Sequence, residues 1–194
     1  PAERLDESEL RGLKTALRDM LGSEALVIDC QTQPLKGGTV GQVRLVTGIA
    51  QTAAAGRPPF RLVQKTQRKW ERPGDPDSWR REYDLYRSGL SDLFDDSLRW
   101  PICFHADMND EQDQTQIWME YIDGPAGYTL TPNMLEQAAH ALGRFQGRLY
   151  AGQPDIPGRL TNLSSSSLMK DIASLIADEA DVRLMPEYYR QCVP

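Results

Sequence analysis

This sequence lacks long apolar runs, paired cysteines and an excess of basic residues, and each absence argues against a class of protein. No apolar stretch approaches the roughly 20 residues that a bilayer-spanning helix needs. The three cysteines, Cys30, Cys103 and Cys192, form no CxxC or His/Cys cluster, so we expect reduced thiols and no zinc site. The net charge of −6 disfavours a nucleic-acid surface, because phosphate binding requires a concentrated basic face.

The remaining composition is typical of a globular protein in the cytoplasm. Hydrophobic residues make up 40% and charged residues 26% of the sequence. The length of 194 residues suits one large domain or two small ones. The acidic N-terminal stretch PAERLDESEL does not resemble a signal peptide. We therefore expect a cytoplasmic protein with neither a membrane nor a nucleic acid as partner, while the oligomeric state stays open.

Periodicity predicts an α+β fold built around an antiparallel sheet. Leucines at helical spacing indicate an amphipathic helix over residues 5–21 that ends at Gly22. Extended patterns with turn signals between them predict five strands, over 25–35, 43–52, 60–67, 97–107 and 114–124. A helix over 78–89, which Asp77 or Ser78 could cap, separates the third strand from the fourth.

The second part of the chain is predicted to be mainly helical. Thr131 and Pro132 can begin a helix that runs to about Tyr150, with Thr at the cap and Pro at the first helical position. A polar, serine-rich stretch over 153–167 follows, and the pattern LMKDIASLIADEADV then indicates a last amphipathic helix. No internal repeat is found.

Two local features could carry chemistry. Gly37, Gly38 and Gly41 lie between two predicted strands, where a glycine-rich tip lets backbone N–H groups approach phosphates, although such tips are usually only turns. Lys65 follows the apolar run of a strand and shares a face with Val63, so its charge must find an anion or reach water. Glu82 lies on the apolar stripe of the next helix and is the expected partner of Lys65.

In this order, these features resemble the protein-kinase-like superfamily, in particular its aminoglycoside phosphotransferase and choline kinase branch. The resemblance covers roughly residues 25–150. It rests on the hairpin KGGTVGQV, the lysine in LVQK, the glutamate in SWRREYDLY and the strand ending in WMEYIDG. It implies a small nucleotide-binding lobe over 1–122, with the N-terminal helix included, and a hinge with a partial helical lobe over 123–194.

The resemblance also implies a set of residues that bind ATP. Lys65 would contact the α- and β-phosphates and Glu82 would hold that lysine. The backbone C=O of Glu120 and N–H of Ile122 would bind the adenine edge, with Met119 behind them. The complete set of implied cofactor-binding residues is Gly37, Gly38, Gly41, Val43, Lys65, Glu82, Met119, Glu120 and Ile122.

The pattern departs from the family in two places. The glycines read G-G-x-x-G, and no catalytic loop with its aspartate base and metal-binding Asn and Asp follows the helix that ends near Tyr150. His105-Ala106-Asp107 spells HxD but precedes the hinge segment, so we expect no catalytic role for it, and His140 should be exposed. The prediction is therefore that this chain holds no catalytic or metal-binding residue and stops before the catalytic loop, the ligands of Mg²⁺ lying outside it.

Three functions remain open from the sequence. The first is an ATP-dependent phosphotransferase that transfers the γ-phosphoryl group to a hydroxyl of a small molecule, with this chain as the ATP-binding part. The second is a kinase-like nucleotide-binding or regulatory module without catalysis. The third is an unrelated α+β domain in which Lys65 and Glu82 need not meet. The acceptor, whether an aminoglycoside, choline or another alcohol, cannot be read from these residues.

Overall fold

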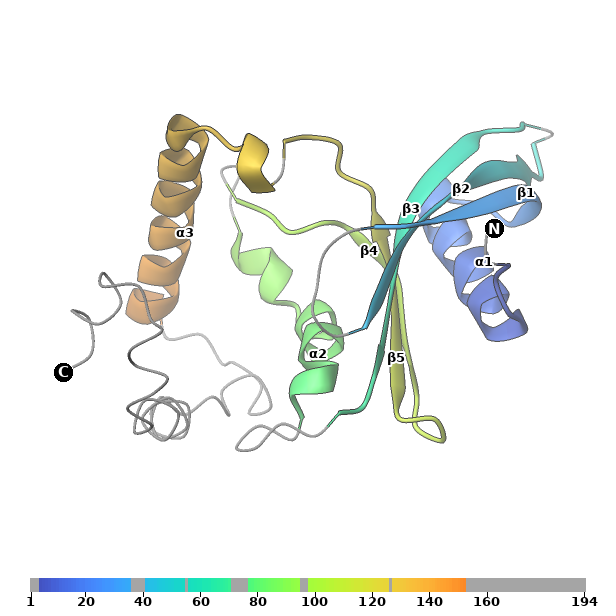
Figure 1. Cartoon of the computed structure of the whole chain (residues 1–194), viewed down its shortest axis with the longest axis horizontal. Coiled ribbons are helices and arrows are strands. Elements are labelled where there is room, and N and C mark those ends of the chain that lie inside the picture. The colour runs from blue at the N-terminus through green and yellow to red at the C-terminus, as the bar shows by residue number, and fades with distance from the viewer. Residues whose placement is uncertain are drawn as a thin grey trace, which may run out of the picture.

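A five-stranded antiparallel sheet forms the centre of the molecule, with the strand order β1-β2-β3-β5-β4 (Figure 1). The structure is a computed structural model that describes residues 4–35, 41–54, 56–70, 77–94, 98–125 and 127–152. The strands are β1 (Ala25–Pro34), β2 (Gln42–Thr52), β3 (Pro59–Arg68), β4 (Cys103–Asn109) and β5 (Gln114–Glu120). The predicted α+β fold with a five-stranded antiparallel sheet is confirmed.

The helix α1 (Glu7–Leu21) covers one face of the sheet and makes the main core. Asp6 and Glu9 form a reciprocal capping box at its start, and Gly22 ends it with a left-handed backbone at φ 66°, as its place after the leucine pattern predicted. The core between α1 and the sheet consists of Leu5, Leu13, Ala16, Leu17, Ala25, Val46, Ala50, Phe60, Leu62 and Trp118.

Strand alternation separates the two faces of the sheet. Phe60, Leu62 and Gln64 of β3 are buried on the α1 side. Successive side chains of a strand point to opposite faces, so Val63 and Lys65 lie on the side away from α1. The predicted grouping of Val63 with Lys65 is therefore correct, but the core against α1 belongs to the other set of positions.

The second face of the sheet carries η1 (Ser78–Arg80), α2 (Arg81–Arg87) and η2 (Leu90–Leu93). The helix predicted over 78–89 is thus shorter and begins as a 3-10 turn around the buried Trp79. The predicted cap by Asp77 or Ser78 does not form. The Asp77 side chain makes no capping hydrogen bond and its backbone, at ψ 6°, is not extended as a cap requires, and the Ser78 hydroxyl has no hydrogen-bond partner.

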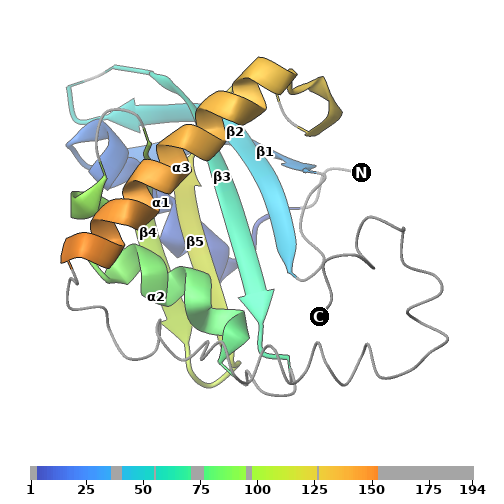
Figure 2. The same cartoon turned by 90° about the vertical axis from the view of Figure 1, so that its left-hand side faces the viewer.

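The last described elements are η3 (Gly127–Thr129) and α3 (Pro132–Gly152), which lies across from the sheet on the same side as α2 (Figure 2). The Thr131 hydroxyl accepts a hydrogen bond from the Met134 N–H at 3.3 Å, which confirms the predicted cap. Leu135 and Leu142, on the predicted apolar face of this helix, are exposed, and Phe145 stacks on Phe94 at 4.6 Å.

Two further predictions can be compared with the fold. The fourth strand starts at Cys103 rather than at residue 97, because Pro101 cannot donate a ladder hydrogen bond and the stretch before it makes side-chain contacts instead. None of the helices in the described part of the chain combines the length and apolar character that a membrane crossing requires. The last predicted helix, from Leu168, lies outside the described residues.

Candidate functional site

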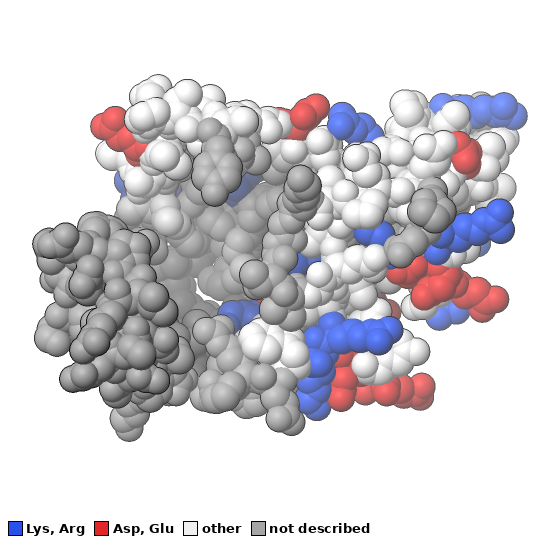
Figure 3. All heavy atoms as spheres, viewed as in Figure 1, with Lys and Arg blue, Asp and Glu red and all other residues white. Residues whose placement is uncertain are grey.

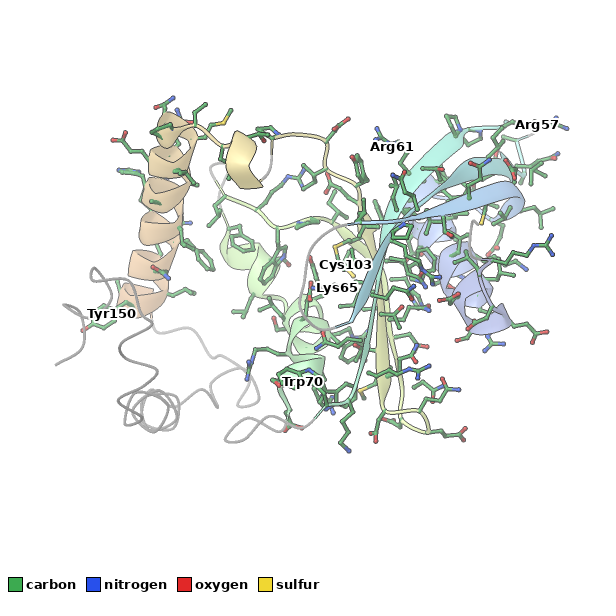
Figure 4. All side chains as sticks on the ribbon, viewed as in Figure 1. Arg57, Arg61, Lys65, Trp70, Cys103 and Tyr150 are labelled. Carbon is green, nitrogen blue, oxygen red and sulfur yellow. The ribbon has the colours of Figure 1, made fainter. Side chains whose placement is uncertain are left out.

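The Lys65 ammonium and the Glu82 carboxylate form an ion pair between β3 and α2. Lys65 projects from the sheet toward α2 (Figure 4). Glu82 lies in the first turn of α2, and its carboxylate accepts a hydrogen bond from the Lys65 ammonium. Both side chains keep about a quarter to a third of their surface, 26% and 31%. The predicted contact is confirmed, and the pair remains accessible to a ligand.

Two cross-strand rows of mainly apolar side chains surround the lysine. Lys65 stands directly between Val43 of β2 and Ile117 of β5 in the register of the sheet. The neighbouring row, one pleat along, consists of Leu45, Val63 and Met119. Ile117 and Met119 are buried, with exposed fractions of 2% and 7%. The predicted residues Val43, Lys65 and Met119 therefore belong to one continuous surface.

Leu45, Val63 and Ile117 of this surface were not predicted as site residues. The signal that could have found them is period-two alternation, because each lies two positions from a predicted residue or directly across from one. Together with Val43 and Met119 they form an apolar floor around the charged Lys65. Such a combination of apolar lining and one placed polar group is typical of small-molecule sites.

Gly41 lies where the chain enters β2, and its backbone requires glycine. Its φ is +91°, and a Cβ built there would lie 2.7 Å from the backbone oxygen of Thr66. Its neighbour on β2, Gln42, pairs with Thr66, and Val43 pairs with Lys65, so Gly41 stands at the end of the strand beside the lysine. Gly37 and Gly38 lie outside the described residues, and their predicted role stays a prediction.

At the end of β5, the Glu120 side chain clamps the strand to the stretch before β4 by hydrogen bonds to Arg99 and Ile102. The sequence did not predict this role. The Glu120 carboxylate accepts two hydrogen bonds from Arg99, at 2.6 and 2.8 Å, and one from the Ile102 N–H at 2.8 Å. The hydrogen bond to the Arg99 guanidinium lowers the pKa of Glu120. The Glu120 N–H also donates to the Ile102 oxygen at 2.9 Å. No spacing signal in the sequence pairs Arg99 with Glu120.

The backbone roles predicted for Glu120 and Ile122 remain predictions. The clamp fixes Glu120 at the point where β5 ends, and the Ile122 side chain that follows is 52% exposed. Next to them, the Arg61 guanidinium lies 4.2 Å from the centre of the Tyr121 ring and 3.7 Å from the Asp123 carboxylate. Arg61 shares the face of Lys65, and the sequence analysis did not identify it.

Behind Met119, Tyr86 connects α2 to the sheet. Its hydroxyl donates to the Met119 sulfur at 3.8 Å, and its ring lies 5.6 Å from that of Trp100. Burial raises the pKa of the Tyr86 phenol above its usual range, so it stays neutral. Because Tyr86 lies one turn after Glu82, these contacts help to fix the helix that presents the carboxylate.

The described cysteines and the HxD triplet do not add a catalytic group to this surface. Cys30 and Cys103 are free, and burial raises the pKa of the Cys103 thiol to about 11, so it is a protonated thiol rather than a nucleophile at neutral pH. His105 and Asp107 pair in register with Trp118 and Gln116, which places them on the α1 face, opposite Lys65. Within the described ranges, no group of three His, Cys, Asp or Glu side chains could hold a metal ion.

His140 is exposed on α3, as predicted, and Cys192 lies outside the described residues. On the face drawn in Figure 3, the lysines and arginines of the described residues are interspersed with aspartates and glutamates.

Comparison with known proteins leaves the family of this chain undetermined. No protein-family model matches the sequence, and no curated protein and no solved structure matches it either. The kinase-like resemblance therefore rests on the residues described above.

Proposed function

We propose that this chain binds ATP through Lys65 and the surrounding face of the sheet, as the nucleotide-binding part of a kinase-like phosphotransferase. The reaction would move the γ-phosphoryl group to a hydroxyl of a small molecule. The single observation that carries the proposal is the Lys65–Glu82 ion pair, set into an apolar surface at the junction of β3 and α2.

Stability alone gives a weak reason for a lysine at this position. A partly exposed ion pair contributes about 0–1 kcal/mol, and holding two long side chains in one geometry costs entropy. An apolar residue between Val43 and Ile117 would instead extend the buried floor, at about 25 cal/mol per Å². A binding role explains why the position keeps an ammonium and why a carboxylate accompanies it.

The residues present fit the chemistry of a nucleotide. Leu45 and Val63 offer an apolar strip for a flat base, with the buried Met119 behind it, and Lys65, one pleat away, offers a cation for phosphate oxygens. Glu82 would orient the ammonium, and Glu120, clamped by Arg99, would hold the end of β5 for backbone contacts with the base. Mg²⁺ would accompany the phosphates and neutralise their charge. The catalytic base and the acceptor site are not assigned to residues of this chain.

Calorimetric titration with a non-hydrolysable ATP analogue and Mg²⁺ tests the binding. Losing a charge-assisted hydrogen bond costs roughly 1.5–3 kcal/mol, so Lys65→Ala should weaken binding about 10- to 150-fold. Lys69→Ala is the matched control, because Lys69 directly follows β3, four residues after Lys65, and also forms an ion pair, with Asp113 at 3.2 Å. Equal affinity of the two variants, or no heat with the unmodified chain, would contradict the proposal.

A nucleotide-binding module without catalysis shares this binding prediction and differs only in turnover. Phosphoryl transfer by the intact protein, measured over a panel of small alcohols, separates the two. Transfer that Lys65→Ala abolishes supports the phosphotransferase. Binding without transfer to any alcohol tested favours the module. An unrelated domain would bind no nucleotide at Lys65.

A further inference from the structure

A hollow formed by described residues lies on the opposite face of the sheet from Lys65. Its volume is about 580 Å³, and Asp6, Ser8 and Glu9 at the start of α1 form one wall. Its floor is the α1-covered face of the sheet, at the start of β2 and the end of β4. This part of the sheet lies next to the turn that joins β4 and β5. This volume falls within the range of roughly 300–1,000 Å³ that is typical of small-molecule sites.

The floor changes from apolar to polar along the strands. Under α1, the row across β2 and β3 is Val46 and Leu62, both fully buried. Two pleats further along, the row across β2, β3, β5 and β4 consists of Gln42, Thr66, Gln116 and Asp107. The row beyond it consists of Arg68, Gln114 and Asn109. Cross-strand neighbours lie about 4.8 Å apart and successive rows about 6.8 Å apart, so the floor is a grid of hydrogen-bonding groups.

Two glutamines on this floor are oriented by their neighbours. The Gln116 oxygen accepts a hydrogen bond from the Trp118 indole N–H at 2.9 Å. The Gln114 oxygen accepts one from the Arg68 Nε–H at 3.3 Å. With the oxygens engaged in this way, the NH₂ group of each amide remains as the donor that the side chain can offer. Asp107, directly across from Gln116, supplies a carboxylate that accepts.

Two buried polar atoms of residues that line the hollow have no hydrogen-bond partner. They are the Thr66 hydroxyl and the Trp70 indole nitrogen. Most buried polar groups in proteins are satisfied, so these two atoms remain available to bond a water molecule or a ligand hydroxyl that enters the hollow. The indole N–H can only donate, whereas the hydroxyl donates or accepts.

We propose that this hollow binds a neutral, polyhydroxylated molecule of one or two sugar rings. A hydroxyl donates and accepts at once, which matches a grid where amide donors stand beside a carboxylate acceptor. Charges of both signs line the hollow: the carboxylates of Asp6, Glu9 and Asp107, and the cations of Arg68 and Lys69. The Glu9 carboxylate is already paired with Arg44, so the remaining charges are close to balance. A strongly anionic or cationic ligand would meet like charge on one side, and an apolar ligand would leave the donors unpaired.

The two sites lie on opposite faces of the sheet, and Gly41, at the start of β2, borders both. Lys65 and Thr66 are neighbours on β3 but point to opposite faces, so a ligand in one site does not touch the other. The nucleotide proposal and the hydroxyl-ligand proposal can therefore succeed or fail separately.

Backbone amide spectra of the full ¹⁵N-labelled chain, titrated with glucose, maltose, trehalose and myo-inositol, test the proposal. At least one of them should shift the signals of Thr66, Gln114 and Gln116. Thr66→Val removes a hydroxyl and should weaken that binding about 2- to 12-fold, and Gln114→Ala should do the same. Thr47→Val, the same change on the opposite face of β2, is the control and should leave the affinity unchanged.

Glycine betaine and inorganic phosphate serve as charged comparison probes. Shifts at these residues with the charged probes alone would overturn the assignment to a neutral hydroxyl ligand. The absence of shifts with all four polyols, or equal affinities of Thr66→Val and Thr47→Val, would overturn the site itself.

Discussion

Each face of the sheet carries a strand cation paired with a glutamate from a helix, but the two pairs differ in how fully they are enclosed. On the α1 face, Arg44 bonds to Glu9 and also to Gln64, whose amide itself donates to Glu9 at 3.2 Å. The Arg44 and Glu9 side chains are only 5% and 12% exposed. On the α2 face, Lys65 and Glu82 keep 26% and 31% of their surface.

The difference indicates two roles for the same residue types. The Arg44 network is enclosed, and Glu9 is engaged by the capping box of α1 as well, so it joins helix to sheet. The lysine pair keeps surface for a further partner. A buried charge that loses its partner destabilises the fold strongly, whereas a partly exposed charge that loses its partner is solvated by water at little cost. The following predictions test that contrast.

Arg44→Met should produce the largest loss of stability. It leaves the Glu9 carboxylate buried beside Gln64 without its cation, and breaking a buried pair costs about 3–5 kcal/mol. Lys65→Met, the matched change on the other face, should alter the free energy of unfolding by about 1 kcal/mol or less. Urea unfolding of both variants measures the difference, and equal losses would remove the distinction between the two pairs.

Gly12→Ala tests how tightly α1 packs on its face. A Cβ at Gly12 would lie 2.2 Å from the Gln116 oxygen and 2.4 Å from the Trp118 nitrogen, so both side chains must shift. Overpacking of this kind costs typically 1–3 kcal/mol. Gly147→Ala in α3 is the control, since nothing lies within 4 Å of its Cβ, and it should be neutral or slightly stabilising. Thermal unfolding of the two variants gives the comparison.

Gly41→Ala tests the start of β2, where Gly41 borders both the Lys65 site and the hollow on the α1 face. Gly41 and Gly22 both have positive φ, which costs an alanine about 1–2 kcal/mol. Only Gly41 also approaches a backbone oxygen, that of Thr66, so Gly41→Ala should be the more destabilising of the two variants in urea. If Gly22→Ala is equally or more destabilising, the close approach of Gly41 to β3 does not contribute to the free energy of unfolding.

Glu120→Gln should give the smallest effect, visible only as a change in pH dependence. The folded-state pKa of Glu120 lies below its unfolded value, so its stabilisation is present above the ordinary carboxyl pKa of about 4.3. That stabilisation is lost as the pH falls through the folded pKa. The urea midpoint of the unmodified chain should therefore drop further in acid than that of the variant. Parallel pH profiles would show that Arg99 does not stabilise the Glu120 carboxylate.

Local patterns in the sequence predicted most of the fold. Extended patterns with turn signals between them predicted the strands, the glycine after the leucine pattern predicted the end of α1, and Thr131-Pro132 predicted the start of α3. The same period of two placed Lys65 and Val63 on one face. Helical spacing placed Glu82 on the apolar stripe of its helix, so its ion pair with Lys65 could be predicted before the fold was known.

What the sequence could not predict depends on register and on distant contacts. The pairing of Thr66 with Gln116, and of Gln116 with Asp107, follows from how three strands align, which no local pattern states. Arg99 and Glu120 are 21 positions apart and meet only because the stretch before β4 returns alongside β5. The short 3-10 start of α2 likewise reflects the burial of Trp79 rather than any capping residue.

A crystal structure of the chain soaked with a non-hydrolysable ATP analogue and Mg²⁺ tests the central claim most directly. The account predicts the base against Val63 and Met119, and a phosphate oxygen within hydrogen-bonding distance of the Lys65 ammonium, with Glu82 still beside it. A nucleotide bound on the α1 face, or a Lys65 ammonium that contacts only Glu82 while the nucleotide binds elsewhere, would contradict it.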